Sequence, residues 1–350
     1  MQPIKTALCS FGMSGWVFHA PFIAAHPHFE LQGVYERSQK RAAEKYPGVQ
    51  SYDSLEDLLA ADNELVVVNT PNDTHYAYAK KALQAGKHVI VEKPFTTTVE
   101  EAKELIELAA QQNKLLSVYH NRRYDSDFKT VAKIIQGGWL GEVVEAELHY
   151  DRYKEELSPK LHKEVPGPST GSLLDLGSHL IDQSLQLFGK PDAVFADIRV
   201  IRPVAKVDDY FEVLLYYPNL RVRLKGSYQV REPLPAFIIH GSKGSFLKSR
   251  TDVQETALQA NRVPGSEGWG VEPEAEQGLL HTEREGIVIR EKVPTETGNY
   301  MAYYDGIYQA IRLHQSPPVA ARDGLRVVEI LQAAHQSSRE QKLIAVGSAG

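Results

Sequence analysis

Residues 5–15 read KTALCSFGMSG, a short apolar run that leads into a turn containing two glycines. The turn, SFGMSG at 10–15, fits the dinucleotide fingerprint G-x-G-x-x-G with Ser10 in place of the first glycine. Gly12 would let the backbone approach a pyrophosphate, and Gly15 would let a helix pack closely beneath the turn. A strand-to-helix turn with two glycines is also common without any ligand. The segments around it are therefore needed to distinguish a dinucleotide-binding turn from an ordinary one.

The first 121 residues alternate between strand-like and helix-like stretches. The strand-like runs are KTALCSF (5–11), FELQGVY (29–35), ELVVVNT (64–70), KHVIVEK (87–93) and KLLSVYH (114–120). Stretches with helical spacing lie between them, the clearest being SLEDLLAAD, THYAYAKKALQAG and TTTVEEAKELIELAAQQN. The second closes on Gly86, and the third opens on threonines followed by carboxylates, which favours a helix end and a helix start. This alternation predicts an α/β domain at 1–121, a Rossmann fold with a doubly wound parallel sheet.

From residue 122 the pattern changes to long runs rich in β-branched and aromatic residues, with few helices between them. These runs are VVEAELHYDRY (143–153), AVFADIRVI (193–201), YFEVLLYY (210–217), LRVRLKGSYQV (220–230) and AFIIHGS (236–242). They predict an α+β domain at 122–350 with a large, open and mostly antiparallel sheet. At 350 residues the chain exceeds the usual size of a single hydrophobic core, which agrees with two domains.

Composition narrows the class of protein. Hydrophobic residues make up 42% of the chain and charged residues 24%, and no window approaches the apolar length of a membrane span. The net charge of −6, without a block of Lys or Arg, argues against nucleic acid as a partner. The N-terminal apolar run lacks the pattern of a secretory signal, and the single cysteine, Cys9, suits a reducing compartment. We therefore expect a cytoplasmic protein that does not bind membranes.

The end of the second strand-like run carries the signal for the kind of nucleotide. Glu36 follows about 20 residues after Gly15, where a carboxylate can bind both ribose hydroxyls of NAD and repel the 2′-phosphate of NADP. Arg37, Ser38 and Lys40 could receive such a phosphate. The local chemistry therefore favours NAD over NADP only slightly, and Glu36 could also be a solvated strand end.

Three later strand ends bring polar side chains to the same predicted edge. NTPNDTH (69–75) follows the third run, GKHVIVEKPF (86–95) contains the fourth, and the fifth ends at His120–Arg123. Open α/β sheets bind ligands at the carboxyl ends of their strands, so Lys93 would face a cleft there. The alternatives are a solvated turn around Lys93 and a helix cap at His75.

The stretch GSLLDLGSHLID (171–182) places Asp175 and His179 four residues apart. On a helix both would project from one face, and a carboxylate beside an imidazole can orient a general base. An ordinary helix pair is the alternative. The 13 histidines show no H-E-x-x-H or Cys/His ligand spacing, so no metal site is expected.

Together, the glycine turn, T-P-N-x-x-H, E-K-P, N-R-R and D-x-x-x-H resemble the Gfo/Idh/MocA family of NAD(P)-dependent oxidoreductases. The similarity spans nearly the whole chain. SVYHNRRYDSDF (117–128), DLGSHLIDQSLQLFG (175–189), DYF (209–211) and GWG (268–270) resemble the branch that contains NADP-dependent scyllo-inositol dehydrogenases. The family includes oxidoreductases of polyols, sugars and sugar derivatives, so the resemblance implies hydride transfer between NAD(P) and a CH–OH group of an inositol-like compound.

The resemblance also implies roles for individual residues. Lys93 would hydrogen-bond the reacting hydroxyl, His179 would remove its proton, and Asp175 would orient His179. The residues implied in cofactor binding are Gly12, Met13, Ser14, Gly15, Glu36, Arg37, Thr70, Pro71, Asn72, His75, Glu92, Lys93 and Asn121. Those implied in substrate binding are Arg122, Arg123, Tyr153 and His162.

Two departures and two alternatives accompany the resemblance. Relatives carry tryptophan and arginine where this chain reads LHKE (161–164), so His162 and Lys163 would alter the pocket, and NADP-preferring relatives tend to lack the acid at Glu36. Family members usually form homo-oligomers through the antiparallel sheet. A non-catalytic dinucleotide-binding sensor and a structural partner with this fold are the alternatives to an enzyme.

Overall fold

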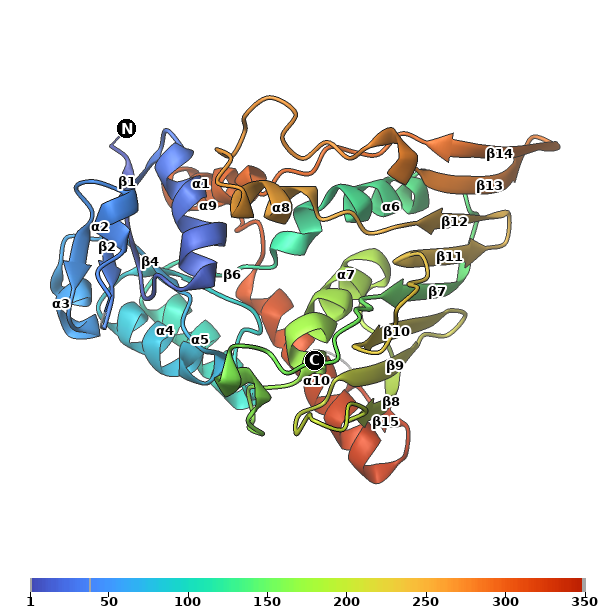
Figure 1. Ribbon diagram of the computed structural model, residues 1–350, viewed down its shortest axis with the longest axis horizontal. Coiled ribbons are helices and arrows are strands. Elements are labelled where there is room, and N and C mark those ends of the chain that lie inside the picture. The colour runs from blue at the N-terminus through green and yellow to red at the C-terminus, as the bar shows by residue number, and fades with distance from the viewer. Residues whose placement is uncertain (1, 38, 348–350) are drawn as a thin grey trace. The chain divides into compact units, whose positions relative to one another are not determined.

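The computed structural model describes residues 2–37 and 39–347, apart from the side chains of residues 161 and 162. The chain forms two compact units, drawn together in Figure 1. Unit 1 comprises 2–121, 253–269 and 299–325, and unit 2 comprises 122–252, 270–298 and 326–347. The chain thus first leaves unit 1 at residue 121, but it returns twice. The two-segment division expected from the sequence does not include these returns.

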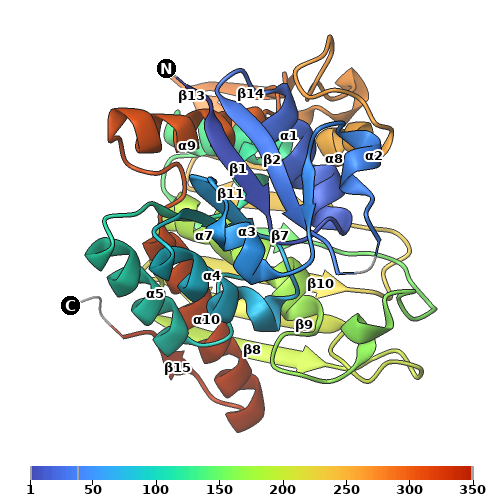
Figure 2. The same ribbon diagram turned by 90° about the vertical axis from the view of Figure 1, so that its left-hand side faces the viewer.

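Unit 1 is built on a parallel sheet with the strand order β3-β2-β1-β4-β5-β6. Its strands β1 and β2 lie side by side in Figure 2. Its strands are β1 Ile4–Leu8, β2 Phe29–Tyr35, β3 Gln50–Tyr52, β4 Leu65–Val68, β5 His88–Val91 and β6 Leu116–Val118. All four β4 residues are fully buried, as expected for a strand covered on both faces. The predicted Rossmann sheet is confirmed.

Strand β3 was not expected from the sequence. It has only three residues. Packing fixes its place, because the Tyr52 ring of β3 lies against the backbone of Gly33 in β2, where a Cβ would come within 2.4 Å of the ring. Short edge strands of this kind carry too little periodicity to be recognised locally.

The helices of unit 1 begin and end largely where local signals predict. Its helical elements are η1 Ser14–His19, α1 Ala20–Ala25, α2 Ala42–Lys45, α3 Leu55–Ala60, η2 Asn72–Thr74, α4 His75–Gln84, α5 Val99–Gln111, α8 Val253–Gln259 and α9 Met301–Leu313, and η3 Asn121–Tyr124 spans the crossing to unit 2. Thr98 and Glu101 form a capping box at the start of α5. Gly86 has a φ of 72°, a left-handed conformation that favours glycine, just after α4. Element η1 is a π-helical turn.

Helix α9 returns to unit 1 because its aromatic side chains complete the core there. Tyr304 stacks on Phe22 with ring centroids 5.9 Å apart, and Tyr303 meets Tyr119 edge-on at 4.8 Å. The Tyr303 hydroxyl also lies 2.8 Å from the Ser117 hydroxyl of β6. All of these aromatic rings are buried, so α9 is an integral part of unit 1.

Unit 2 is built on a sheet with the order β14-β13-β12-β11-β7-β10-β9-β8-β15. Its strands are β7 Val143–His149, β8 Ala193–Arg199, β9 Tyr210–Tyr216, β10 Arg221–Ser227, β11 Phe237–Gly241, β12 Gly244–Lys248, β13 Gly278–Arg284, β14 Ile287–Val293 and β15 Ile344–Ala345. Among the described strands of this second sheet only β7 and β10 pair in parallel, so the mostly antiparallel sheet is confirmed. Each of the five runs identified in the sequence contains a strand.

Helices cover one face of this sheet. The core joins its inward-facing side chains to α6 Ser126–Gln136, α7 Ser178–Phe188 and α10 Ala321–Glu340. The remaining helical turns of this part are η4 Leu161–Glu164, η5 Leu173–Gly177 and η6 Glu274–Glu276. No helix among the described residues is both long and apolar enough to span a bilayer.

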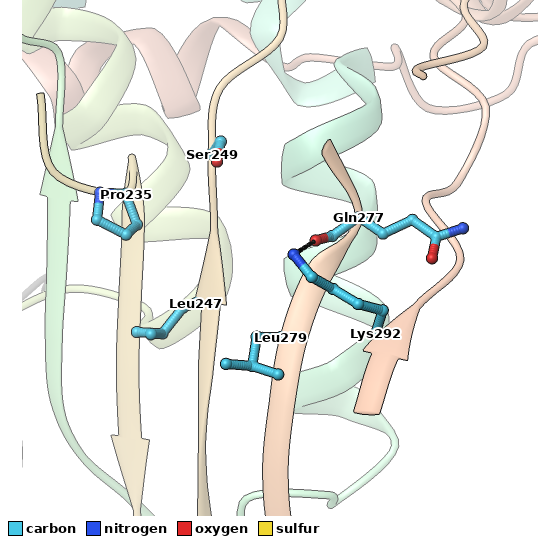
Figure 3. Close-up of a pocket in the computed structure, with 6 residues that line it drawn as sticks. All are labelled: Pro235, Leu247, Ser249, Gln277, Leu279 and Lys292. Atoms are coloured by element: carbon cyan, nitrogen blue, oxygen red, sulfur yellow. Dashed lines mark hydrogen bonds between the residues drawn. The ribbon is translucent and has the colours of Figure 1, made fainter. Parts of the chain in front are cut away.

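The other face of the sheet carries half-buried polar and apolar side chains. Arg223 pairs there with Glu147 at 2.9 Å and with Glu212 at 3.0 Å. A pocket of about 210 Å³ lies at β12–β14, lined by Pro235, Leu247, Ser249, Gln277, Leu279 and Lys292 (Figure 3). The Lys292 ammonium donates to the Gln277 carbonyl oxygen at 2.8 Å across its rim.

Candidate active site

In unit 1, the carboxyl ends of the parallel strands form one edge. The glycine turn follows β1, Glu36 follows β2, and Thr70 lies just after β4. Lys93 lies just after β5, and Asn121 follows β6. Because parallel strands end on the same side of a sheet, these predicted site residues share that edge, and the sheet order reverses between β1 and β4 as ligand-binding α/β sheets require.

The glycine turn has the geometry that its sequence predicts. A Cβ on Gly15 would lie 2.4 Å from the Ser10 carbonyl oxygen and 2.9 Å from the Asn69 amide nitrogen, so only glycine fits. That Asn69 nitrogen donates to the Ser10 carbonyl oxygen at 2.8 Å and braces the turn from β4. Gly12 is exposed, and a Cβ there would meet only the Ser10 hydroxyl, at 3.5 Å. The closely packed Gly15 and the exposed Gly12 thus fit a turn that binds a pyrophosphate.

The Glu36 carboxylate is engaged within unit 1. It accepts hydrogen bonds from the backbone N–H of Arg41 at 2.9 Å, from that of Ala42, and from the Ser51 hydroxyl at 2.6 Å. The residue is 5% exposed, so its negative charge is fixed at the end of β2. Arg37 is exposed beside it, and Ser38 lies outside the described residues.

Glu92 of the E-K-P motif is the centre of a hydrogen-bond network. Its Oε1 accepts from the Ser14 hydroxyl at 2.5 Å and lies 2.9 Å from Nε2 of His19, while Oε2 accepts from the Lys93 backbone N–H at 3.1 Å. The other ring nitrogen of His19 lies 2.7 Å from the Tyr304 hydroxyl. Burial by itself would raise the pKa of Glu92, but the His19 hydrogen bond and charge, Ser14 and Lys93 lower it to about 2. Glu92 therefore links the first helix to the loop that carries Lys93.

We expect acid to weaken this network, because the pKa of Glu92 is lower in the folded protein than the ordinary value of 4.5. A depressed pKa stabilises the folded state above about pH 4.5, and that stabilisation is lost as the pH falls towards about 2. Glu92→Gln should therefore be less stable than the wild type at pH 7, by about 2 kcal/mol, and the difference should shrink below pH 4.

Urea unfolding curves at pH 7, 5 and 3 measure this difference. Glu107→Gln, an exposed carboxylate on α5, is the matched control and should change little at any pH. A Glu92→Gln deficit that stays constant down to pH 3 would contradict an ionised, network-bound Glu92.

The loop with Lys93 is also held by His75, the first residue of α4. The Lys93–Pro94 peptide bond is cis. His75 is fully buried, with one ring nitrogen 2.8 Å from the Pro94 carbonyl oxygen and the other 3.0 Å from the Thr70 carbonyl oxygen. With no exposed surface and both nitrogens facing carbonyl groups, His75 connects two loops, whereas the sequence predicted a helix cap and the family resemblance implied a cofactor contact. Burial lowers the pKa of His75.

The remaining predicted cofactor residues of unit 1 surround these two loops. Met13 is 44% exposed at the glycine turn, and Pro71 is exposed after β4. Asn72 begins the η2 turn, and the Thr74 hydroxyl donates to the Thr70 hydroxyl at 2.6 Å. Asn121 is 6% exposed at the end of β6.

In unit 2, Asp175 and His179 lie at the start of one helix. Asp175 is in the π-helical turn η5, and His179 is in the first turn of α7 with 7% of its surface exposed. The Asp175 carboxylate lies 3.3 Å from the Lys163 ammonium, and the His179 ring lies 6.4 Å from the Tyr150 ring. The sequence predicted the helix but not its π-helical start.

Asp208 fixes the start of this helix. Its Oδ2 accepts from the Leu173 backbone N–H at 2.8 Å and from the Ser172 hydroxyl at 3.0 Å. Gly171, with a φ of 112°, lets the carboxylate approach, since a Cβ there would be 1.8 Å from Oδ1. Burial raises the pKa of Asp208. Asp208 precedes the DYF motif, but nothing in its local sequence indicates this partner.

Both arginines predicted to bind substrate have carboxylate partners within unit 2. Arg123 binds Asp182 with two nitrogens, Nε at 2.9 Å and Nη2 at 2.6 Å. Arg122 is 5% exposed and binds Asp252 at 2.5 Å and Asp125 at 3.2 Å. These ion pairs anchor α7 and the segment before α6, so both guanidinium groups stabilise the fold of unit 2.

Two other predicted substrate residues lie in the segment between β7 and η5. Tyr153 is 37% exposed, and its hydroxyl donates to Glu155 at 2.6 Å. The His162 side chain lies outside the described part of the chain. No cluster of three or more His, Cys, Asp or Glu side chains suited to a metal ion occurs among the described residues.

Comparisons with known proteins agree with this arrangement. Residues 4–120 match the description "Oxidoreductase family, NAD-binding Rossmann fold", and residues 132–346 match "Oxidoreductase family, C-terminal alpha/beta domain". The chain is 38% identical over 345 residues to scyllo-inositol 2-dehydrogenase (NADP(+)) IolW of Bacillus subtilis, covering 98% of this chain and 96% of that protein.

Two further proteins extend the comparison. The crystal structure of an oxidoreductase from Bacillus cereus superposes with a TM-score of 0.90 at 32% identity and covers 99% of both chains. Glucose-6-phosphate 3-dehydrogenase of Bacillus subtilis is 30% identical over 209 residues, which cover 56% of this chain and 59% of that protein.

Proposed function

The chain belongs to the Gfo/Idh/MocA family of oxidoreductases, and we propose that it transfers hydride between NAD(P) and a secondary alcohol or ketone of an inositol-like cyclitol or sugar. The observation that carries the proposal is that the glycine turn after β1 and Lys93 after β5 lie at the same carboxyl edge of one parallel sheet. The relatives named as inositol and sugar dehydrogenases support a CH–OH group as the reacting centre.

The nicotinamide, when bound, supplies the hydride acceptor or donor. The hydroxyl proton then needs a base, and we assign His179 to that role with Asp175 as its orienting partner. Lys93 would donate a hydrogen bond to the reacting oxygen, while Glu92 accepts from the Lys93 backbone N–H and holds the loop.

We assign the dinucleotide to the exposed carboxyl edge of unit 1. The backbone at Gly12, Met13, Ser14 and Gly15 would meet the pyrophosphate, because the Ser14 hydroxyl is already bound to Glu92. The remaining cofactor positions that we propose are Glu36, Arg37, Thr70, Pro71, Asn72, Glu92, Lys93 and Asn121. His75 would act by positioning Thr70 and Pro94.

The proposed enzyme is tested by mixing the purified protein with a panel of cyclitols and aldoses, using both NAD and NADP, and following NAD(P)H absorbance. Turnover of at least one cyclitol or aldose is expected. Dinucleotide binding without turnover of any compound, in either direction, would instead favour a non-catalytic sensor.

We propose that both dinucleotides bind and that NAD(H) binds more tightly. The fixed negative charge of Glu36 at the end of β2 would repel a 2′-phosphate, while the exposed Arg37 would partly offset that repulsion. Fluorescence titration with NADH and NADPH measures the ratio, and Glu36→Gln should shift it towards NADPH. If NADPH binds about tenfold more tightly than NADH to the wild type, or 1.4 kcal/mol, Arg37 rather than Glu36 sets the preference.

We also propose a homo-oligomer that pairs the outer faces of two unit 2 sheets. Phe195 is 39% exposed on β8, and Leu247 and Leu279 line the pocket on β12 and β13 (Figure 3). Such apolar side chains on an open sheet suit a partner sheet. Light scattering should give a mass at least twice the 39.1 kDa of one chain, and Phe195→Asp should lower the measured mass. A monomer at micromolar concentration would contradict this.

A further inference from the structure

Arg152 is a cation that has no counter-ion among the described side chains. Its guanidinium lies over the Tyr150 ring at 5.2 Å, and the residue is half-buried just beyond β7. No hydrogen bond or ion pair joins this guanidinium to another described side chain, whereas Arg122, Arg123 and Arg202 of the same unit all bind carboxylates.

A second cation lies nearby. The Lys154 ammonium is 5.4 Å from the Tyr228 ring and also has no ion pair with a described residue. Burial lowers the pKa of Lys154, and the positive charges of Arg152, Lys163 and Arg202 lower it further. Arg152 is half-buried, so its charge is kept partly out of water, which costs free energy unless an anion joins it. The exposed Lys154 adds a second positive charge beside it.

The carboxylates around these cations are committed elsewhere. Asp175 lies 3.3 Å from Lys163, and Asp151 lies 3.2 Å from His149. Glu164 accepts from the Ser158 backbone N–H at 2.8 Å and lies 3.6 Å from Arg202.

The two cations flank the residues proposed for proton transfer. The Tyr150 ring, which the Arg152 guanidinium contacts, also has its centroid 6.4 Å from that of the His179 ring. Lys154 in turn experiences the charge of Asp175. An anion bound by Arg152 would thus belong to the molecule that reacts at His179.

We infer that Arg152, supported by Lys154, receives a carboxylate or phosphate group of the substrate, so that the enzyme acts on an acidic sugar or cyclitol. A guanidinium presents two parallel N–H donors that match either oxyanion. This inference rests on the proposed dehydrogenase function and narrows its substrate class.

The test compares neutral compounds with their charged counterparts. Glucose is paired with glucuronate and with glucose 6-phosphate, and myo-inositol with its monophosphate, so that the carboxylate and phosphate arms are separate. For at least one pair we expect kcat/KM to be about 10- to 100-fold higher for the charged member, and less so at high salt. Arg152→Gln should bring that ratio close to one, and Arg152→Lys should restore part of it.

Arg284→Gln is the matched control, because Arg284 also lies over an aromatic ring, Trp139 at 4.7 Å, but at the far end of β13. It should keep the wild-type ratio. Equal or better turnover of the neutral compounds, or an unchanged ratio in Arg152→Gln, would overturn the inference and leave the dehydrogenase standing.

Calorimetry separates the two proposals if no compound turns over. Glucuronate and inorganic phosphate are titrated into the wild type and into Arg152→Gln, with circular dichroism as a check of folding. Binding that requires Arg152 would support the anion site although the proposed reaction had failed. No binding of either anion to the wild type would overturn the anion site.

Discussion

Replacing His179 with alanine should lower kcat by about 10²- to 10⁴-fold and leave dinucleotide affinity nearly unchanged. The loss is that expected when a general base is removed from a hydroxyl that must give up its proton. Affinity should persist because His179 belongs to unit 2, whereas the glycine turn belongs to unit 1. Steady-state kinetics on the best substrate and NADH fluorescence titration measure the two quantities.

Two variants sharpen this experiment. His281→Ala removes an exposed histidine from β13 and should behave as the wild type. Asp175→Asn should cost less than His179→Ala and shift the acid limb of the pH–rate profile to lower pH, because a carboxylate raises the pKa of a nearby imidazole. A kcat within about twofold of the wild type in His179→Ala would refute the assignment of the base.

Replacing Lys93 with alanine should lower kcat by about 10²- to 10³-fold and raise KM. The ammonium would donate to the oxygen on which negative charge develops, so its loss weakens the transition state more than the ground state. The loop should keep its shape, because Glu92 accepts from the backbone N–H of residue 93 and His75 holds Pro94.

Lys103→Ala, an exposed lysine on α5, is the control and should leave both constants unchanged. Unfolding curves check that Lys93→Ala is folded. A variant that loses stability and activity together would indicate a structural lysine, and one that changes KM alone would indicate uniform binding of the substrate.

The strands that the sequence could predict were those with long apolar or alternating runs. β4 is buried on both faces and reads as four consecutive apolar residues. β3 and the return of α9 could not be predicted, because Tyr52 is placed by Gly33 and Tyr304 by Phe22, partners that are distant along the chain. Periodicity reports which face is apolar and gives no information on what covers it.

The candidate site divides in a similar way. Residues at strand ends, such as Lys93, could be placed because the parallel topology sends every carboxyl end to one edge. Their hydrogen-bond partners could not be placed, because His19 reaches Glu92 across 73 residues and Arg123 reaches Asp182 across 59. Neither pair has a local spacing that would mark it.

The division of the chain also determines when each unit can be completed during synthesis. The described chain passes between the units at 121/122, 252/253, 269/270, 298/299 and 325/326. A ribosome that has released only the first 121 residues has released every strand of the parallel sheet, yet Phe22 and Tyr119 still lack the rings of α9 that bury them. Nascent unit 1 therefore leaves the rings of Phe22 and Tyr119 without these partners until α9 emerges, and such exposed apolar surface makes a folding intermediate prone to aggregate.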